Sequence, residues 1–418
     1  MLQIETGRSV EATVVLNSSA EVRPVLNANV ADLPATEMRV HWITNPVELA
    51  EWLPQWQRLA EVAAEPNVFY EPEFLMAALR HLRGSEQVGV MLITAPPRVN
   101  PAAEPVLCGL FPLKLMNRFS GLPARVTEFW RHDQCYLTAP LIRRDVLRET
   151  WESFWDAMQN GVDARKLDWI SLPMLPGDGP VHSMLVDWIA RHEVHSYVRR
   201  RYRRAMMIRE SGFEEFLSRR VPKKGRQEST RLMRKLEREH RVEMVASGDA
   251  RSVKDLLELE MAGWKGREGT ALACQESTGK FFDEMTRDMA RAGRLQTLSL
   301  QVDGKTVASK LNLLSGSHGY AFKIAFDESL ARFSPGMLLE VENIRHLHES
   351  TNIQSMDSCA DPDHPMINHL WPDRRGIESM LISLGTRRGD WLMAIRPLMQ
   401  QISSLFQRKK KPASKKPS

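Results

Sequence analysis

The feature that most constrains the fold of this chain is an order of predicted elements that occurs twice. Residues 38–44 alternate in polarity like a strand, and two helical patterns follow at 46–64 and 71–82. The rest of the first half alternates between strands and helices. Three strand-like runs, then a helix, a strand and a helix, lie at 87–94, 105–116, 125–132, 144–159, 166–173 and 179–192. The order is therefore β-α-α-β-β-β-α-β-α.

The second half repeats this order without detectable identity. A strand at 241–247 and helices at 250–264 and 277–293 precede three strands, of which the first two meet at Asp303-Gly304. That dipeptide is a strong hairpin signal. The remaining strand, helix and strand lie at 319–326, 335–349 and 352–359. We therefore predict an α+β protein in which two mixed sheets, related by duplication, pack side by side.

The length of 418 residues supports two domains, because it exceeds what one core normally holds. Pro24 and Pro34 interrupt a polar start, so residues 1–37 are predicted to form a flexible arm. Residues 38–195 form the first predicted domain and 196–389 the second. Residues 390–418 remain as an amphipathic helix with a basic tail.

The four cysteines have no CxxC spacing, which favours free thiols in a reducing compartment over disulfides or zinc. No signal peptide and no run of about 18 apolar residues is visible. We therefore expect a cytoplasmic protein, or one at the inner face of the membrane. Residues 390–407 carry an apolar helical face and 408–418 a lysine-rich tract, which together could bind anionic lipid or dock on the protein itself.

A Ser-Pro-Gly triplet, Ser334 to Gly336, stands between a predicted strand and a predicted helix. One interpretation is structural: Ser334 caps the helix and Pro335 fits its first position. The other is functional. A helix N-terminus offers unpaired amides and a favourable dipole to an anion. The triplet alone leaves both open.

Three stretches resemble a known family: residues 326–349, which contain the triplet, residues 264–271 (WKGREGTA) and residues 356–375 (MDSCADPDHPMINHLWPDRR). Together with the element order, they resemble GNAT-like acyltransferases of the cellulose and exopolysaccharide (CelD) type. More distantly, they resemble the Fem-type aminoacyl transferases. The resemblance covers roughly residues 38–385 and implies tandem GNAT domains that use acetyl-CoA or another acyl-CoA, without a metal. The GNAT phosphate loop has the pattern Q/R-x-x-G-x-G/A, and here RFSPGM lacks the middle glycine.

The resemblance implies roles for residues at the end of the second half. Arg332, Ser334 and the amides of Gly336, Met337 and Leu338 would hold the donor diphosphate. Asp357 would be the catalytic base, although such a carboxylate also forms turns. Lys323 would polarise a carbonyl or bind an anion, unless it only faces solvent. No G-x-S-x-G motif or cysteine–histidine pair is visible, so direct transfer from the donor is preferred over an acyl-enzyme.

Further residues are candidates for the acceptor pocket. Trp264 and Lys265 fall between two helices where GNAT folds form an acceptor wall, although a tryptophan there is equally typical of a core. His364, Asn368 and Trp371 follow on a proline-rich loop, whose single histidine argues against a metal. The acceptor would be a small molecule, a glycan or a lipid.

Basic residues gather at 199–204 (RRRYRR), which joins the halves, and at 219–241. The second stretch is typical of a solvated helix with ion pairs, and it could also bind phosphates, an acidic polymer or RNA. Two rival functions therefore stay open. One is a Fem-like transferase that uses aminoacyl-tRNA, and the other is a binding module that kept the fold but lost the chemistry.

Overall fold

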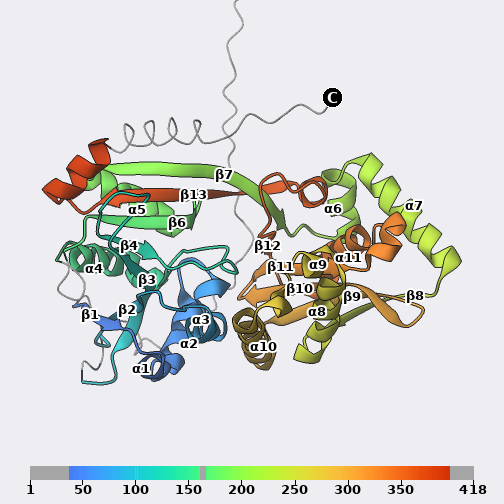
Figure 1. Ribbon diagram of the computed structural model, residues 1–418, viewed down its shortest axis with the longest axis horizontal. Helices are drawn as coiled ribbons and strands as arrows, with labels where there is room; N and C mark the ends of the chain where they lie inside the picture. Colours follow the sequence, from blue (N-terminus) through green and yellow to red (C-terminus); the bar gives the residue numbers. More distant parts are fainter. Residues whose placement is uncertain (1–36, 99, 101, 161–165, 396–418) are drawn as a thin grey trace, which may run out of the picture.

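A computed structural model describes residues 37–98, 100, 102–160 and 166–395, in two halves that lie beside each other (Figure 1). The first half contains five principal helices and six strands. They are β1 (Arg39–Ile43), α1 (Pro46–Ala50), α2 (Leu53–Val62), α3 (Pro72–His81), β2 (Val88–Ala95), β3 (Val106–Met116), β4 (Val126–Phe129), β5 (Leu141–Ile142), α4 (Leu147–Asn160), β6 (Trp169–Pro176) and α5 (Pro180–Arg191).

The second half follows the same order after a long strand and two helices, of which the second is basic. Its elements are β7 (Ser196–Ile208), α6 (Phe213–Arg220), α7 (Lys223–Glu239), β8 (Val242–Ser247), α8 (Val253–Ala262), α9 (Trp264–Arg267), α10 (Glu276–Arg291), β9 (Leu295–Val302), β10 (Lys305–Ser315), β11 (His318–Phe326), η6 (Glu328–Phe333), α11 (Pro335–Ser350), β12 (Ser355–Asp357), α12 (Ile367–Leu370) and β13 (Asp373–Ser383). The repeated element order predicted from the sequence is confirmed.

The prediction of two separate sheets is wrong. The described strands form one mixed sheet in the order β1-β2-β3-β4-β6-β13-β7-β12-β11-β10-β9-β8, with β5 paired to β3. The joint is the antiparallel pair β7–β13, whose register runs from Asp373 opposite Met206 to Ile382 opposite Ser196.

Two strands of the second half join the halves at this point. β13, the last strand of the chain, also pairs with β6 of the first half, and β7 also pairs with β12 of the second half. In Figure 1, β7 and β13 run together across the top of the molecule. The residues 199–204 that we interpreted as a connector therefore belong to a strand. The division at 195 and 196 stays a prediction, since β13 of the second half also completes the sheet of the first.

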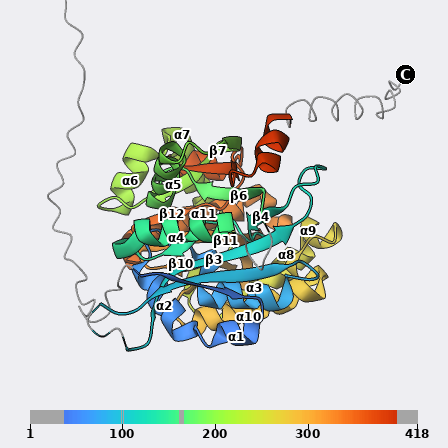
Figure 2. The ribbon, with the colours of Figure 1, turned by 90° about the vertical axis from the view of Figure 1, so that its left-hand side faces the viewer.

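Helices cover both faces of the sheet. In Figure 2, α4 and α5 lie above β3, and α1 to α3 lie below it. Phe154 of α4 stacks on Phe111 of β3 at 4.4 Å between ring centroids. In the second half, buried Lys310 of β10 donates from Nζ to Oε2 of buried Glu340 of α11 at 2.8 Å. The face of β10 that carries Lys310 is therefore covered by α11.

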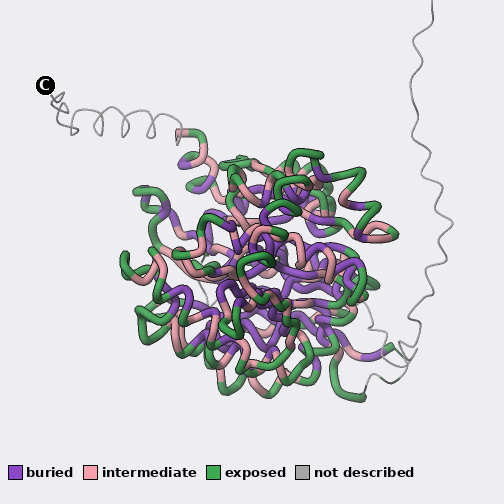
Figure 3. Tube along the Cα trace, turned by 90° about the vertical axis from the view of Figure 1, so that its right-hand side faces the viewer, coloured by how far each residue is buried: buried purple, intermediate pink, exposed green. Residues whose placement is uncertain are grey.

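The two halves also contact each other through α3 and α10. The rings of Phe74 and Phe281 meet edge to face at 5.2 Å, and His81 Nε2 lies 2.7 Å from Glu284 Oε2. In Figure 3, which looks from the side of the second half, the buried trace fills the middle and the exposed trace the rim. The contact between the halves is therefore part of the interior of the molecule.

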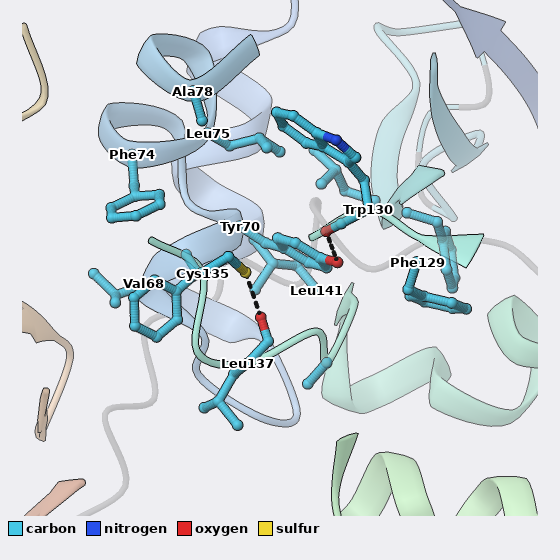
Figure 4. Packing of buried hydrophobic residues seen from close by; sticks show 14 of the residues in the cluster. Val68, Tyr70, Phe74, Leu75, Ala78, Phe129, Trp130, Cys135, Leu137 and Leu141 are labelled. Carbon is cyan, nitrogen blue, oxygen red and sulfur yellow. Dashed lines mark hydrogen bonds between the residues drawn. The ribbon is translucent and has the colours of Figure 1, made fainter. Parts of the chain in front are cut away.

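A loop after β4 is held rigidly in the core. Tyr70 Oη donates to the carbonyl of Trp130 at 2.8 Å, and Cys135 Sγ donates to the carbonyl of Leu137 at 3.0 Å (Figure 4). Trp130, Cys135 and Leu137 are at most 1% exposed. The segment 130–139, which we call the seam loop, is therefore fixed in position although it has no regular structure.

Most of the predicted arm and basic tail lie outside the described residues. The described chain ends in a helix at 387–395, where Leu392 is buried and Trp391 is exposed. Across the described part of the chain, none of the helices combines the length and the apolarity needed to cross a bilayer.

Candidate functional site

The strands β11 and β12 part at the centre of the second half. They pair in parallel from His318 opposite Ser355 to Tyr320 opposite Asp357, and β11 then continues to Phe326 after β12 has ended. We call the space beyond Tyr320 and Asp357 the β11–β12 opening. Backbone groups and side chains of β11 beyond Tyr320 can face a ligand there.

The corresponding place in the first half is filled by the protein itself. There β4 and β6 pair only as far as Glu128 opposite Ser171. Beyond that pair, the Thr138 amide donates to the Met174 carbonyl at 3.0 Å, and the Met174 amide donates to Thr138 Oγ1 at 3.2 Å. The seam loop therefore covers β6 where a ligand would have to enter.

The seam loop also supplies a side chain to the second half. Lys323 of β11 donates from Nζ to Tyr136 Oη at 3.3 Å. Burial and, to a smaller extent, the positive charge of Lys265 lower the pKa of Lys323 to about 8, while Glu260 opposes the shift. Roughly a tenth of Lys323 is therefore a neutral amine at pH 7, against less than a thousandth for an ordinary lysine, and the neutral form can accept a proton.

Asp357 lies at the end of β12, as predicted, and is 2% exposed. Its Oδ2 accepts from Arg204 Nη2 at 2.7 Å and from Arg375 Nη1 at 3.1 Å, and its Oδ1 accepts from the amide of Cys359 at 3.0 Å. Burial alone would raise the pKa of Asp357, but the two arginines outweigh it and lower the pKa. Such a carboxylate is a weak base, so the geometry makes Asp357 the centre of an ion-pair network.

This network ties the two halves together. Arg204 comes from β7 and also donates from Nη1 to the carbonyl of Tyr136 at 2.9 Å. Arg375 comes from β13 and donates from Nη2 to Glu65 Oε1 of the first half at 3.2 Å. Burial raises the pKa of Glu65 to about 7 against the opposing charge of Arg375. The seam loop and the β11–β12 opening are thereby held at a fixed separation.

The Ser-Pro-Gly turn has a conformation that the sequence did not reveal. Helix α11 begins at Pro335 as predicted, but Ser334 is left-handed, with φ of 51°, and its side chain caps nothing. The Ser334 carbonyl accepts from the amides of Met337 and Leu338 at 2.9 and 3.1 Å. Two of the three amides assigned to a diphosphate are thus already bonded.

The rest of the predicted cradle is also engaged. Arg332 Nη2 donates to Glu239 Oε2 at 2.8 Å. Gly336 is buried, and a Cβ there would lie 3.2 Å from Phe326 Cδ1 of β11. The glycine therefore lets α11 approach β11, and diphosphate binding by Arg332, Ser334, Gly336, Met337 and Leu338 stays a prediction that this geometry does not favour.

The two predicted acceptor residues on α9 differ in surroundings. Trp264 is 52% exposed, and its amide donates to Glu328 Oε1 at 2.8 Å. Lys265 donates from Nζ to buried Glu260 Oε1 at 2.8 Å and is close enough to Lys323 to lower its pKa. Lys265 therefore belongs to the surroundings of the opening, and an acceptor role for either residue stays a prediction.

The residues predicted on the proline-rich loop stabilise the loop itself. Trp371 is fully buried in an apolar cluster with Ile367 and Leu370, so it cannot line an accessible pocket in this conformation. Asn368 donates from Nδ2 to the Pro362 carbonyl at 2.6 Å, and the amide of Ile367 donates to His364 Nδ1 at 3.3 Å. Within the described residues, no group of three or more His, Cys, Asp or Glu side chains is placed to hold a metal ion.

Three residues of the site were missed in the sequence: Tyr136, Arg204 and Arg375. Tyr136 belongs to the seam loop, and nothing in its local sequence indicates a role in the other half. Arg204 and Arg375 lie 153 and 18 positions from Asp357, the carboxylate that they share. Had residues 196–208 been predicted as a strand, the alternation of side chains between its two faces could have placed Arg204 on the inner face.

Comparisons with known proteins agree with this architecture. Residues 223–364 match the family model described as "Acetyltransferase (GNAT) domain". No curated protein matches the chain closely enough to count as a relative. The match covers the β11–β12 opening and the Ser-Pro-Gly turn, and with the fold it supports an acyltransferase of the GNAT class.

Solved structures with a similar fold cover most of the chain. FemX superposes with a TM-score of 0.53 and 10% identity, over 79% of this chain and 95% of that one. The C-terminal domain of a putative lysylphosphatidylglycerol synthetase from Agrobacterium fabrum superposes with a TM-score of 0.46 and 11% identity, over 84% of this chain and 97% of that one. A tandem GNAT protein from the clavulanic acid biosynthesis pathway superposes with a TM-score of 0.40 and 14% identity, over 83% of this chain and 99% of that one. The FemX likeness supports the fold alone, and the other two are too weak to support any argument. Residues 223–364 thus match a GNAT domain, and the same order of elements recurs in the first half.

Proposed function

We propose that this protein transfers an acyl group to an amine or hydroxyl, and that the reaction centre is the β11–β12 opening. The observation that carries the proposal is the contact between Lys323 and Tyr136. It brings a lysine with a pKa of about 8 and a phenol from the other half to the place where the strands part. General base catalysis favours a pKa near the working pH, and Lys323 meets this condition.

The chemistry requires two groups besides the substrates. The acceptor nitrogen or oxygen attacks the carbonyl carbon of a thioester, and neutral Lys323 Nζ takes up its proton. The developing oxyanion accepts a hydrogen bond from Tyr136 Oη, which is free to rotate its proton toward the substrate. As the carbon–sulfur bond breaks, the lysine returns the proton to the leaving thiolate, so the site is restored.

Cys359 is not proposed as a nucleophile. Its thiol is buried beside Asp357, and burial raises its pKa far above the ordinary value, with the charge of Asp357 adding to the shift. A neutral thiol is a poor nucleophile. Direct transfer without an acyl-enzyme is therefore the proposed route.

A Fem-like reaction with aminoacyl-tRNA is a second candidate. It is favoured by the Ser-Pro-Gly turn, whose bonded amides and paired Arg332 are poorly suited to a CoA diphosphate. Helix α7 also presents Arg234 and Arg238 without an acidic partner among the described residues. An acyl ester on RNA would require the same base and the same oxyanion donor.

The experiment is transfer by purified protein from a panel of acyl-CoAs and aminoacyl-tRNAs to amine and hydroxyl acceptors, followed by mass spectrometry. Product with either donor class is expected for the wild type and about 100-fold less for Lys323→Met. The control is Lys254→Met, which removes an exposed lysine of α8. Equal activity of Lys323→Met and the wild type would refute the assignment, and no product with any donor would favour a non-catalytic module.

Several features predicted from the sequence stay proposals. The resemblance to the exopolysaccharide type supports a glycan, lipid or other small acceptor, and an acyl-CoA donor. Attachment of residues 390–418 to an anionic membrane surface at the inner face rests on their composition alone. Flotation with anionic vesicles, with and without these residues, tests the attachment.

A further inference from the structure

A cavity of about 650 Å3 lies at the seam between the halves, beside the proposed reaction centre. Tyr136 and Cys359 line it from one side, and residues of β7 line it from another. Its volume is that of sites for small organic ligands. Since Tyr136 also contacts Lys323, the cavity borders the β11–β12 opening.

An irregularity in β7 turns an unusual number of its side chains toward this cavity. In the pairing with β13, Arg200 lies opposite Ser379 and Val198 opposite Met380, so Arg199 is an extra residue. An extra residue reverses the alternation of a strand. Arg204, Tyr202 and Arg200 on one side of the bulge, and Arg199 and Tyr197 on the other, therefore share the cavity face and all line the cavity.

The next arginines of the same strand face the other way. Arg201 donates from Nε to Glu378 Oε1 at 2.7 Å, and Glu378 also lies 3.3 Å from His182 of α5. Arg203 has the same parity as Arg201 and is exposed. The strand thus separates its arginines into a cavity set and an opposite set.

The cavity set carries uncompensated positive charge. Arg204 is buried and paired with Asp357, whereas Arg131, Arg199 and Arg200 have no acidic partner among the described residues. Arg199 lies over the Phe119 ring at 4.8 Å and Arg200 over the Tyr202 ring at 4.6 Å, which leaves their edges able to donate. Asp361 is the acidic residue in the lining.

We infer that this seam cavity binds a phosphate-bearing group of a substrate through Arg131, Arg199 and Arg200. Arginine is suited to phosphate because its planar fork donates two parallel hydrogen bonds to the oxygens. Tyr202 and Tyr136 offer apolar faces for the part of the molecule next to the phosphate. The inference rests on the proposed function only for what happens at Lys323, because binding needs no transfer.

The phosphate could belong to the acceptor or to a CoA donor, and both sources present the same chemistry. Binding is therefore measured by calorimetry at low salt with inorganic pyrophosphate, with glucosamine 6-phosphate and with CoA. Competition between the sugar phosphate and CoA would place the donor's phosphates in the cavity. Simultaneous binding of the sugar phosphate and CoA would indicate that the cavity binds the phosphate of the acceptor.

The deciding variants compare the two faces of one strand. The double variant Arg199→Gln, Arg200→Gln is expected to bind pyrophosphate about 30-fold more weakly than the wild type. Arg203→Gln, on the opposite face, is expected to bind it as the wild type does. Equal weakening by Arg203→Gln, or no binding by the wild type, would overturn the inference.

Lys323→Met separates this inference from the proposed reaction. The variant should lose transfer but keep pyrophosphate binding, because Lys323 does not line the cavity. Phosphate binding without transfer in the wild type would defeat the proposed reaction alone. Transfer to neutral acceptors without phosphate binding would defeat the cavity assignment alone.

Discussion

Lys323 can be tested without knowledge of the substrate, because its pKa is linked to stability. Burial is the main reason why its pKa is about 8 in the folded protein in place of the ordinary 10.5. That difference corresponds to a penalty of about 3 kcal/mol on the charged form. The unfolded chain has no such penalty, so folding opposes protonation of this amine.

The sign of the effect follows from proton binding. Between pH 8 and pH 10.5 the unfolded state binds more protons at this residue than the folded state, so Lys323 makes stability rise with pH in that window. Below pH 8 the amine is charged in both states and the full penalty remains. Lys323→Met removes the group, and the free energy of unfolding of the wild type minus that of the variant should increase by about 3 kcal/mol across the window.

Urea denaturation of both proteins at several pH values between about 7 and 10.5 measures this difference. Other groups titrate in both proteins and cancel. The control Lys254→Met removes an exposed lysine of α8 and measures what the loss of a lysine side chain does by itself to the urea titrations. A difference between Lys323→Met and the wild type that does not change with pH would refute the lowered pKa and remove the reason for choosing Lys323 as the base.

Three further predictions concern the surroundings of the site. Lys310→Met leaves the carboxylate of buried Glu340 without its cationic partner, and it should lower the free energy of unfolding by about 3–5 kcal/mol in urea titrations. The double variant with Glu340→Leu should recover part of that loss. No recovery would contradict the pairing. Asp357→Asn should also lower the free energy of unfolding by about 3–5 kcal/mol, because Arg204 and Arg375 lose the negative charge that they share. Lost activity with unchanged stability would instead support Asp357 as the catalytic base. Gly336→Glu should keep its Tm within a few degrees, since Phe326 is 39% exposed and can move aside; an unchanged thermal shift with CoA is expected, and a lost shift would restore the diphosphate cradle.

The sequence was sufficient for the order of elements because each element has its own local pattern. The hairpin at Asp303-Gly304 and the start of α11 at Pro335 are examples, since turn and helix-start residues act on their neighbours. β7 was missed for the opposite reason. Its arginines have no apolar alternation, and the strand forms because β13 and β12 pair with it from far away in the chain.

The candidate site was predictable only in part, for a related reason. The sequence placed Lys323 and Asp357 in the strands where the structure has them, β11 and β12, but residues of the other half shape the surroundings of each. Arg204 makes Asp357 a paired anion, and Tyr136 covers Lys323. Trp371 was taken for a pocket wall, and only the packing of its neighbours shows it to be core.

The pairing of β7 with β13 explains why the predicted site residues lie at the seam between the halves. Because β13 completes the sheet of the first half and β7 that of the second, Arg204 and Arg375 reach the end of β12 from adjacent strands. The seam loop closes the opening of its own half through Thr138 and sends Tyr136 to the other. Neither half taken alone would contain Lys323, Tyr136 and the network around Asp357. A half expressed by itself should therefore lack the reaction centre even if it folds, because the centre needs residues from both halves.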